Sequence, residues 1–253
     1  STALGGVINV ITKESAPRPE TNVRLSSGIY DDPAWPEWKW TDDLLYFSDI
    51  DADHSRKIGN TSMFISVGRH QSAGYRQNAK YLNYNATGKF KVTFSPQSNL
   101  TLLSSWESGD NEIGLMWKNP YQALAVEEPA VGDKMHSNKF GLNAMHQWAV
   151  NQSFGLKTRA SYFRNFFEYF MHDNEDYSTA QRLGMELQAY YILSKSQSLT
   201  FGTENTYDHI AADPLGNHNI ITLSVYAQDE IRLIPTVIMT VGARLDYTST
   251  DSD

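Results

Sequence analysis

Apolar and polar residues alternate along the last part of the sequence, from residue 219 to residue 247. The apolar positions are Ile221, Leu223, Val225, Ala227, Ile231, Leu233, Val237, Met239, Val241, Ala243, Leu245 and Tyr247. Side chains of a strand point to opposite faces with a period of two, so the pattern predicts two strands that each have one apolar and one polar face. A tight turn at Ile234–Pro235 separates them. Runs of about a dozen residues exceed the length of most soluble strands and are long enough to cross a bilayer with a tilt.

Similar alternation upstream predicts nine further strands. They cover about 21–30, 44–51, 60–70, 81–94, 98–108, 138–150, 152–170, 182–193 and 198–210. The strand at 44–51 is the weakest of the set, because several consecutive apolar residues interrupt its alternation. The sequence therefore predicts an all-β chain.

The predicted connections differ in length in a regular way. Those at 95–98, 150–152, 194–197 and 234–235 are tight, and they alternate with longer ones at 31–43, 109–137, 171–178 and 211–218. Such alternation places every second connection at the same end of the strands, as in an outer-membrane barrel with short periplasmic turns and longer outer loops. A soluble β-sandwich with Greek-key crossings would not sort its connections in this way. The pattern favours an antiparallel transmembrane β-barrel.

The composition is compatible with a barrel and excludes several other classes. Hydrophobic residues make up 40% of the chain and the mean hydropathy is −0.47, so no stretch is apolar enough for a membrane-spanning helix. A barrel strand is apolar only at every second residue, so its hydropathy signal is weak. The absence of cysteine excludes disulfides and thiolate sites. A net charge of −8 argues against nucleic acid as a partner.

Two short motifs resemble one protein family. Residues 5–13 read Gly-Gly-Val-Ile-Asn-Val-Ile-Thr-Lys, which resembles the strand that ends the plug domain of TonB-dependent outer-membrane receptors, with Val10 where isoleucine is usual. The stretch from Ser72 to Arg76 reads Ser-Ala-Gly-Tyr-Arg and is similar to a second segment of that family. The resemblance implies that residues 1–15 are the C-terminal end of a plug domain and that 16–253 form the N-terminal half of a barrel.

The number of predicted strands agrees with half a barrel. Eleven strands are about half of the roughly 22 found in plugged outer-membrane transporters. The last residues, 248–253, are polar and resemble the start of another loop. We therefore expect most of the plug and the second half of the barrel to lie outside this chain.

Charged residues gather on the polar faces of the predicted strands. Given the resemblance, we expect the following ones to hold a plug inside the barrel through charge-assisted hydrogen bonds: Arg24, Lys89, Lys91, Lys157, Arg159, Arg182, Glu186, Glu204, Arg232 and Arg244. Lys139, Glu107, Glu230 and Asp246 lie on the same faces. The alternative is that these charges only line a hydrated lumen.

Aromatic residues of the two longest predicted loops are the candidates for ligand binding. They are Trp35, Trp38, Trp40, Trp117 and Tyr121. Flat rings bind large, ring-rich ligands with little loss of conformational entropy. Equally, tryptophans near a barrel rim can anchor loops at the membrane interface.

Metal binding and catalysis find little support in the sequence. Asp49, Asp51 and Asp53 resemble the start of a calcium loop, but His54 and Asn60 stand where an EF-hand needs glycine and glutamate, so a solvated turn is the preferred interpretation. His146 has no obvious serine partner for nucleophilic catalysis. We predict no enzyme activity, no metal site and no cofactor.

The resemblance implies a receptor in the bacterial outer membrane that takes up a bulky, scarce nutrient. The expected cargo is a ferric siderophore, with cobalamin or haem as alternatives. The expected partners are the TonB complex, reached through an N-terminal region outside this chain, and outer-membrane lipid and lipopolysaccharide. The alternative functions are a passive porin-type channel and a soluble β-sandwich binding module.

Overall fold

Eleven β-strands and three short 3-10 helices make up the computed structural model, which describes residues 18–213 and 215–252. The strands are β1 (Glu20–Ile29), β2 (Tyr46–Ile58), β3 (Thr61–Ser72), β4 (Tyr81–Ser95), β5 (Ser98–Glu112), β6 (Lys134–Ala149), β7 (Phe154–Met171), β8 (Asn174–Ser194), β9 (Gln197–Ala212), β10 (Gly216–Ile234) and β11 (Val237–Ser252). The 3-10 helices are η1 (Pro36–Trp38), η2 (Pro120–Gln122) and η3 (Glu128–Ala130).

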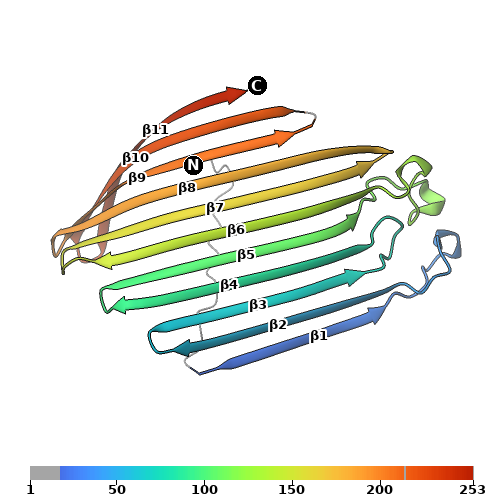
Figure 1. Cartoon of the computed structure of the whole chain (residues 1–253), viewed down its shortest axis with the longest axis horizontal. Coiled ribbons are helices and arrows are strands. Elements are labelled where there is room, and N and C mark those ends of the chain that lie inside the picture. The colour runs from blue at the N-terminus through green and yellow to red at the C-terminus, as the bar shows by residue number, and fades with distance from the viewer. Residues whose placement is uncertain (1–17, 214, 253) are drawn as a thin grey trace.

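The strands form one antiparallel sheet in which each strand pairs with its neighbours in sequence (Figure 1). This sequential order is the up-and-down plan of a barrel wall. A β-sandwich would need two packed sheets, so that alternative is wrong. Within the described residues, no helix is long and apolar enough to span a membrane.

The eleven predicted strands are all present, but several are longer than predicted. The strand expected at 44–51 runs from Tyr46 to Ile58, and the strand expected at 182–193 runs from Asn174 to Ser194, over 21 residues. Asp49, Asp51 and Asp53 therefore lie within β2, and their interpretation as a solvated turn is wrong.

Every connection at one end of the sheet is short, and the long connections all lie at the other end, together with two short ones (Figure 1). At the first end only residues 59–60, 96–97, 150–153, 195–196 and 235–236 link the strands. At the second end, hereafter the outer end, the links are 30–45, 73–80, 113–133, 172–173 and 213–215.

Two outer connections predicted to be long are tight hairpin turns. Only His172 and Asp173 join β7 to β8, and both have a positive φ, of 50° and 64°. Two successive residues with positive φ match the twist of flanking antiparallel strands, so the strands continue up to the turn. The connection predicted at 211–218 is likewise reduced to 213–215.

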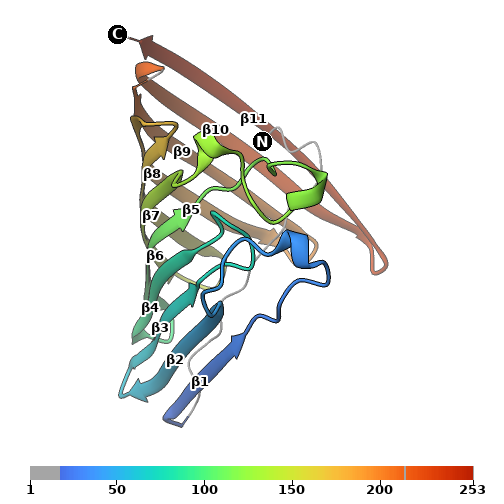
Figure 2. The same cartoon turned by 90° about the vertical axis from the view of Figure 1, so that its right-hand side faces the viewer.

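The sheet is curved, and loops 30–45 and 113–133 lean over its concave side (Figure 2). The predicted plug strand, residues 5–13, and the whole segment 1–15 lie outside the described residues.

Candidate functional site

Strand register sorts the side chains onto two faces that continue across all eleven strands. Residues directly opposite each other in an antiparallel pair lie on the same face. On one face Arg24 is opposite Asp51, Glu107 is opposite Lys139, and Arg159 is opposite Glu186. Every one of the ten charged residues predicted to hold a plug lies on this face. It is hereafter the lumen face.

Crowding identifies the lumen face as the concave one. Ser55, Ser137 and Ser224 lie on it and are at most 3% exposed. Glycines on this face make room for large side chains: a Cβ on Gly155 would lie 2.2 Å from the Tyr190 ring, and one on Gly202 would lie 2.6 Å from the Tyr226 hydroxyl. A curved sheet brings side chains together on its inner side, so the polar face is the inner one.

Arg244 on β11 is the centre of the densest polar network on the lumen face. Its guanidinium donates to Glu204 Oε2 at 2.9 Å, to Asp246 Oδ1 at 2.8 Å and to Ser224 Oγ at 2.8 Å. These contacts join β9, β10 and β11. Hydrogen bonds between ions of opposite charge are stronger than neutral ones, so the network fixes these side chains in position.

A second network adjoins the first. Tyr226 Oη donates to Glu186 Oε1 at 2.9 Å, and Arg159 Nη1 lies 3.4 Å from the other oxygen of Glu186. Glu186 is directly opposite Glu204 across β8 and β9. A hollow of about 470 Å³ lies beside Glu186, Tyr226 and Arg244. At this point the lumen face therefore has charged side chains beside an open hollow.

Other predicted lumen residues lie further along the same face. Arg182 is paired with Asp208, to which its Nη2 donates at 3.1 Å, and Lys139 Nζ lies 2.8 Å from Glu107 Oε1. Lys89 and Lys91 lie on β4. Lys157 lies on the half of β7 that is farther from the outer end, and Arg232 lies near the end of β10 that is opposite the outer end. The predicted residues thus share one face but are spread over the whole wall.

The aspartates of β2 form a separate acidic row on the lumen face. His70 lies between two of them, with Nδ1 3.1 Å from Asp49 and Nε2 3.2 Å from Asp51. Asp53 accepts a hydrogen bond from Asn22 at 3.1 Å. Among the described residues, no group of three or more acidic or histidine side chains is arranged to hold a metal ion.

The opposite face carries an apolar band bordered by rings. Leu183, Met185 and Leu187 of β8 are each about half exposed. Towards the outer end the band is bordered by Tyr84, Trp106, Phe140, Tyr162, Tyr207 and Tyr247, and towards the other end by Phe94, Trp148, Phe154 and Tyr191. Tyr162 and Phe154 are eight positions apart, which is about 26 Å along the strand and, at a tilt of about 40°, about 20 Å across the membrane, close to the roughly 25 Å apolar band of outer-membrane barrels.

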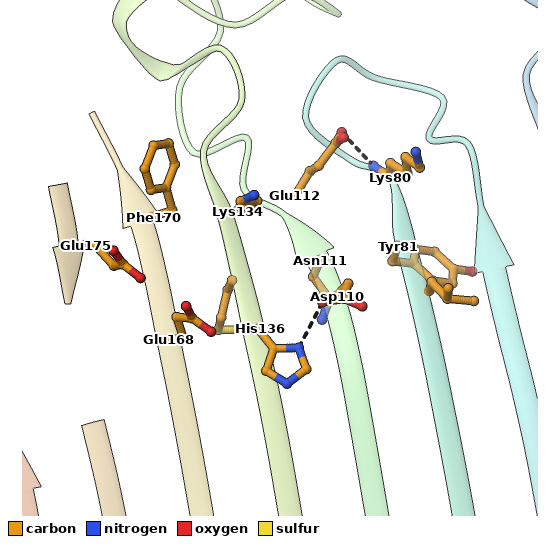
Figure 3. Close-up of a pocket in the computed structure, with 12 residues that line it drawn as sticks. Lys80, Tyr81, Asp110, Asn111, Glu112, Lys134, His136, Glu168, Phe170 and Glu175 are labelled. Carbon is orange, nitrogen blue, oxygen red and sulfur yellow. Dashed lines mark hydrogen bonds and ion pairs between the residues drawn. The ribbon is translucent and has the colours of Figure 1, made fainter. Parts of the chain in front are cut away.

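Above the outer ring border, this outward face becomes charged. A cavity of about 770 Å³ lies there against the ends of β4 to β8 (Figure 3). Two contacts lie among its side chains: His136 Nδ1 is 2.8 Å from Asp110 Oδ1, and Lys134 lies over the Phe170 ring, 5.5 Å from its centroid. Tyr177, nearby on β8, donates to Glu175, and this bond raises the pKa of Tyr177 to about 12. This cavity thus faces away from the lumen.

The aromatic residues predicted to bind ligand come from loops that meet at the outer end. Helix η1 in loop 30–45 contacts η2 in loop 113–133. The Trp35 and Trp38 rings are 6.5 Å apart, while Trp117 and Tyr121 are 61% and 77% exposed. Trp40 differs from the others, because its Nε1 donates to the Tyr75 carbonyl and ties the first loop to loop 73–80.

Buried polar contacts hold these loops in place. The Asn78 side chain donates to the carbonyls of Ile113 and Ala130 and accepts from Gly132 N, so it joins loop 73–80 to both ends of loop 113–133. Asp133, 3% exposed, accepts from the backbone of His172 at 2.8 Å. In loop 30–45, the carboxylates of Asp42 and Asp32 raise the pKa of Lys39 by binding it.

Two features of the structure were not predicted from the sequence. His146 does have a serine partner, since its Nε2 lies 3.0 Å from Ser98 Oγ on the outward face. The ring of Phe94 also lies near His146, and a nucleophile would need an orienting group and oxyanion donors in addition. The second feature is a set of aromatic rings on the lumen face of β7, namely Phe163, Phe167 and Tyr169. Each is an even number of residues from Arg159, so the period of two along a strand predicts that they share its face.

Solved structures of similar fold are known for this chain. No protein-family model matches the sequence, and a search of curated proteins finds no match. Among solved structures, the siderophore receptor PirA from Pseudomonas aeruginosa is 15% identical with a TM-score of 0.73, over 98% of this chain and 40% of that one. The ferric citrate transporter FecA in its unliganded form is 12% identical with a TM-score of 0.73, over 98% of this chain and 40% of that one. The ferric-catecholate import receptor Fiu from E. coli K12 is 14% identical with a TM-score of 0.70, over 94% of this chain and 46% of that one.

This chain thus spans less than half the length of the solved structures that it matches. It has the barrel fold of the TonB-dependent siderophore receptors, and the resemblance predicted from the sequence is confirmed for the fold.

Proposed function

We propose that this chain forms the first half of the barrel of an outer-membrane receptor for the TonB-dependent uptake of a ferric siderophore. The observation that carries the proposal is the alignment of 98% of the chain with part of a siderophore receptor, at a TM-score of 0.73. Residues 1–15 would be the end of the plug, and 16–253 the barrel wall. Cobalamin and haem are the alternative cargoes. A passive porin is not favoured, because the solved structures of matching fold are transport receptors.

The plug would be held by the charged residues of the lumen face. Arg244 and Glu186 support this role best, because both belong to networks that fix their side chains beside a hollow of about 470 Å³. A preorganised charge binds an incoming partner with less loss of side-chain entropy. Arg24, Lys89, Lys91, Lys157, Arg159, Arg182, Glu204 and Arg232 would serve the same role over the rest of the wall.

The outer loops would capture the ligand. Trp35, Trp38, Trp117 and Tyr121 present their rings from loops that buried contacts hold together, whereas the role of Trp40 would be to support the loops. The receptor would bind and pass on its cargo without making or breaking covalent bonds. Its energy would come from the TonB complex, which would engage the N-terminal region outside this chain.

Lipid would surround the outward face. The apolar band would meet the hydrocarbon of the bacterial outer membrane, and the charged cavity above the rings would lie at the level of lipid and lipopolysaccharide headgroups. Because its cations and carboxylates are interspersed, this surface suits a layer that contains both phosphates and bound cations.

Energy-dependent uptake of radioactive iron tests the proposal. Cells that make the full-length protein would take up iron(III) supplied as a catecholate or citrate complex, with saturation, and a protonophore would abolish the uptake. The control is the same strain without the protein. Uptake that persists after the protonophore and rises linearly with concentration would support a passive channel instead.

A further inference from the structure

A row of polar residues crosses the outward face just above the outer ring border. Arg164 of β7, Gln181 of β8, His209 of β9 and Asn219 of β10 lie directly opposite one another in successive strand pairs. Arg164 is two residues beyond Tyr162 of the ring border, so the two share a face and are about 6.6 Å apart along the strand. This row, hereafter the outer polar row, therefore lies at the level where the rings predict lipid headgroups.

Ring hydroxyls occupy acceptor atoms of the outer polar row. Tyr162 Oη donates to Gln181 Oε1 at 3.1 Å, and Tyr207 Oη donates to Asn219 Oδ1 at 2.8 Å. His209 Nδ1 also lies 2.9 Å from Asn219 Oδ1. An amide whose oxygen is bound in this way presents its NH2 group, which can only donate. The row thus presents mainly hydrogen-bond donors to its surroundings.

Arg164 adds an unbalanced charge to these donors. Its side chain is exposed, and within residues 18–213 and 215–252 it makes no hydrogen bond or ion pair. Phe140 and Gln181, the residues directly opposite it, are uncharged. Strand β7 lies in the middle of the sheet and the long outer loops lean over the concave side, so the guanidinium faces the membrane layer (Figures 1 and 2).

Carboxylates mark where this donor-rich surface ends. Glu168, on the same face of β7, is four residues from Arg164, which is about 13 Å along the strand. Across the sheet, the outer polar row ends at Asp251 of β11, which lies opposite Asn219. The donor-rich surface is therefore limited to the first three members of the row, on β7, β8 and β9. Three neighbouring strands span about 10 Å, which is the size of one headgroup rather than of a protein partner.

We propose that Arg164, Gln181 and His209 form a site for a phosphate group of lipopolysaccharide in the outer leaflet of the membrane. The proposal rests on the proposed function, because it requires the outward face to meet lipid. A guanidinium binds phosphate through two parallel N–H bonds, and the amide NH2 beside it supplies a further donor. A phosphate held here would fix the depth of the wall at its outer ring border.

Binding of three probes to the full-length protein in detergent micelles tests the site. The probes are diphosphorylated lipid A, the same glycolipid with its phosphates removed, and inorganic phosphate, and calorimetric titration measures each affinity. Arg164→Gln removes the charge, and Gln181→Glu replaces the amide donor with a carboxylate of the same shape. The control is Arg56→Gln on β2, because Arg56 is an outward cation near the end opposite the outer end and makes no hydrogen bond or ion pair within the described residues.

The expected result is a loss that depends on the phosphate. Arg164→Gln and Gln181→Glu should weaken the binding of diphosphorylated lipid A about threefold to tenfold, between the effect of an exposed ion pair and that of a charged hydrogen bond. Arg164→Lys keeps the charge without the fork and should recover part of the loss. Arg56→Gln should bind like the wild type, and the dephosphorylated glycolipid should bind weakly and equally to every variant. Heat-modifiable gel mobility verifies that each variant is folded.

Three outcomes would overturn the proposal. Equal losses in Arg164→Gln and Arg56→Gln would mean that only the net charge of the protein matters. Equal binding of the two glycolipids would mean that the phosphate is not recognised, and inorganic phosphate that binds as tightly as diphosphorylated lipid A would indicate a site for the free ion. Each of these leaves the proposed iron uptake intact, whereas a wild type that folds as a soluble monomer without lipid or detergent would refute both.

Discussion

The two faces of this sheet treat neighbouring residues of one strand in opposite ways. On β10, Ser224 is 2% exposed and accepts a hydrogen bond from Arg244, while the next residue, Val225, is 55% exposed among apolar neighbours. The lumen face is crowded and linked by polar contacts across strands, whereas the outward face is open and apolar. The difference indicates that lipid, rather than a packed core, is the environment expected on the outside.

The crowding also changes what each face tolerates. A new charge on the outward band would meet hydrocarbon, and its cost would depend on depth in the membrane. A larger side chain on the lumen face would meet atoms: a Cβ on Gly202 would lie 2.6 Å from the Leu187 carbonyl oxygen. Polarity therefore limits substitutions on the outward face, and side-chain volume limits them on the lumen face.

The largest expected effect comes from a charge on the outward face. Val225→Arg in the full-length protein would reduce the free energy of folding into vesicles by roughly 2–4 kcal/mol, because the guanidinium would lie in hydrocarbon near the midplane. The matched control is Gln228→Arg on the lumen face of the same strand, near Glu230, which should cost little. Urea titration in vesicles measures both. Equal costs for the two variants, or folding of the wild type as a soluble monomer without lipid, would refute the difference between the faces.

An intermediate effect is expected from the lumen network. Arg244→Met would leave Glu204 and Asp246 without their cation and would lower the free energy of unfolding by about 1–2 kcal/mol, a modest value because these side chains are partly exposed. The control is Arg232→Met, near the end of β10 that is opposite the outer end. This change should alter the free energy of unfolding by less than about 0.5 kcal/mol. The same urea titration applies. A cost for Arg232→Met that matches or exceeds that of Arg244→Met would contradict the network.

The smallest effect concerns the ring border of the outward face. Tyr207→Phe removes a 2.8 Å hydrogen bond from the phenol to Asn219 and should cost about 0.5–1 kcal/mol. Tyr247→Phe is the control, because the Tyr247 hydroxyl makes no hydrogen bond within the described residues. Loss of stability in the control but not in Tyr207→Phe would show that the hydroxyls act through lipid headgroups rather than through the protein.

The sequence by itself determined the class of fold and the division into faces. A period of two is a local property of an extended chain, so Arg159, Glu186, Glu204 and Arg244 could be assigned to one face without knowing which strands pair. Because one face of the strand meets hydrocarbon and the other meets water, apolar and polar residues alternate along its sequence. This holds only where a strand crosses the membrane.

Beyond the membrane, both faces of a strand meet water, and the alternation disappears. For this reason the sequence predicts a loop at 171–178, which includes the first residues of β8, and another at 211–218, which includes the ends of β9 and β10. The same loss of contrast hid the rings of β7, where phenylalanine occupies both faces above the ring border.

Only the tertiary structure decided which groups meet. The contacts of Arg244 with Ser224 and Glu204, the contact of His146 with Ser98, and the bond of Gly132 to Asn78 link residues that are 20 to 54 positions apart. Such contacts depend on the register between strands and on the path of the loops, which the cross-strand hydrogen bonds fix together. A pattern with a period of two specifies the face on which a side chain lies but not the residue opposite it.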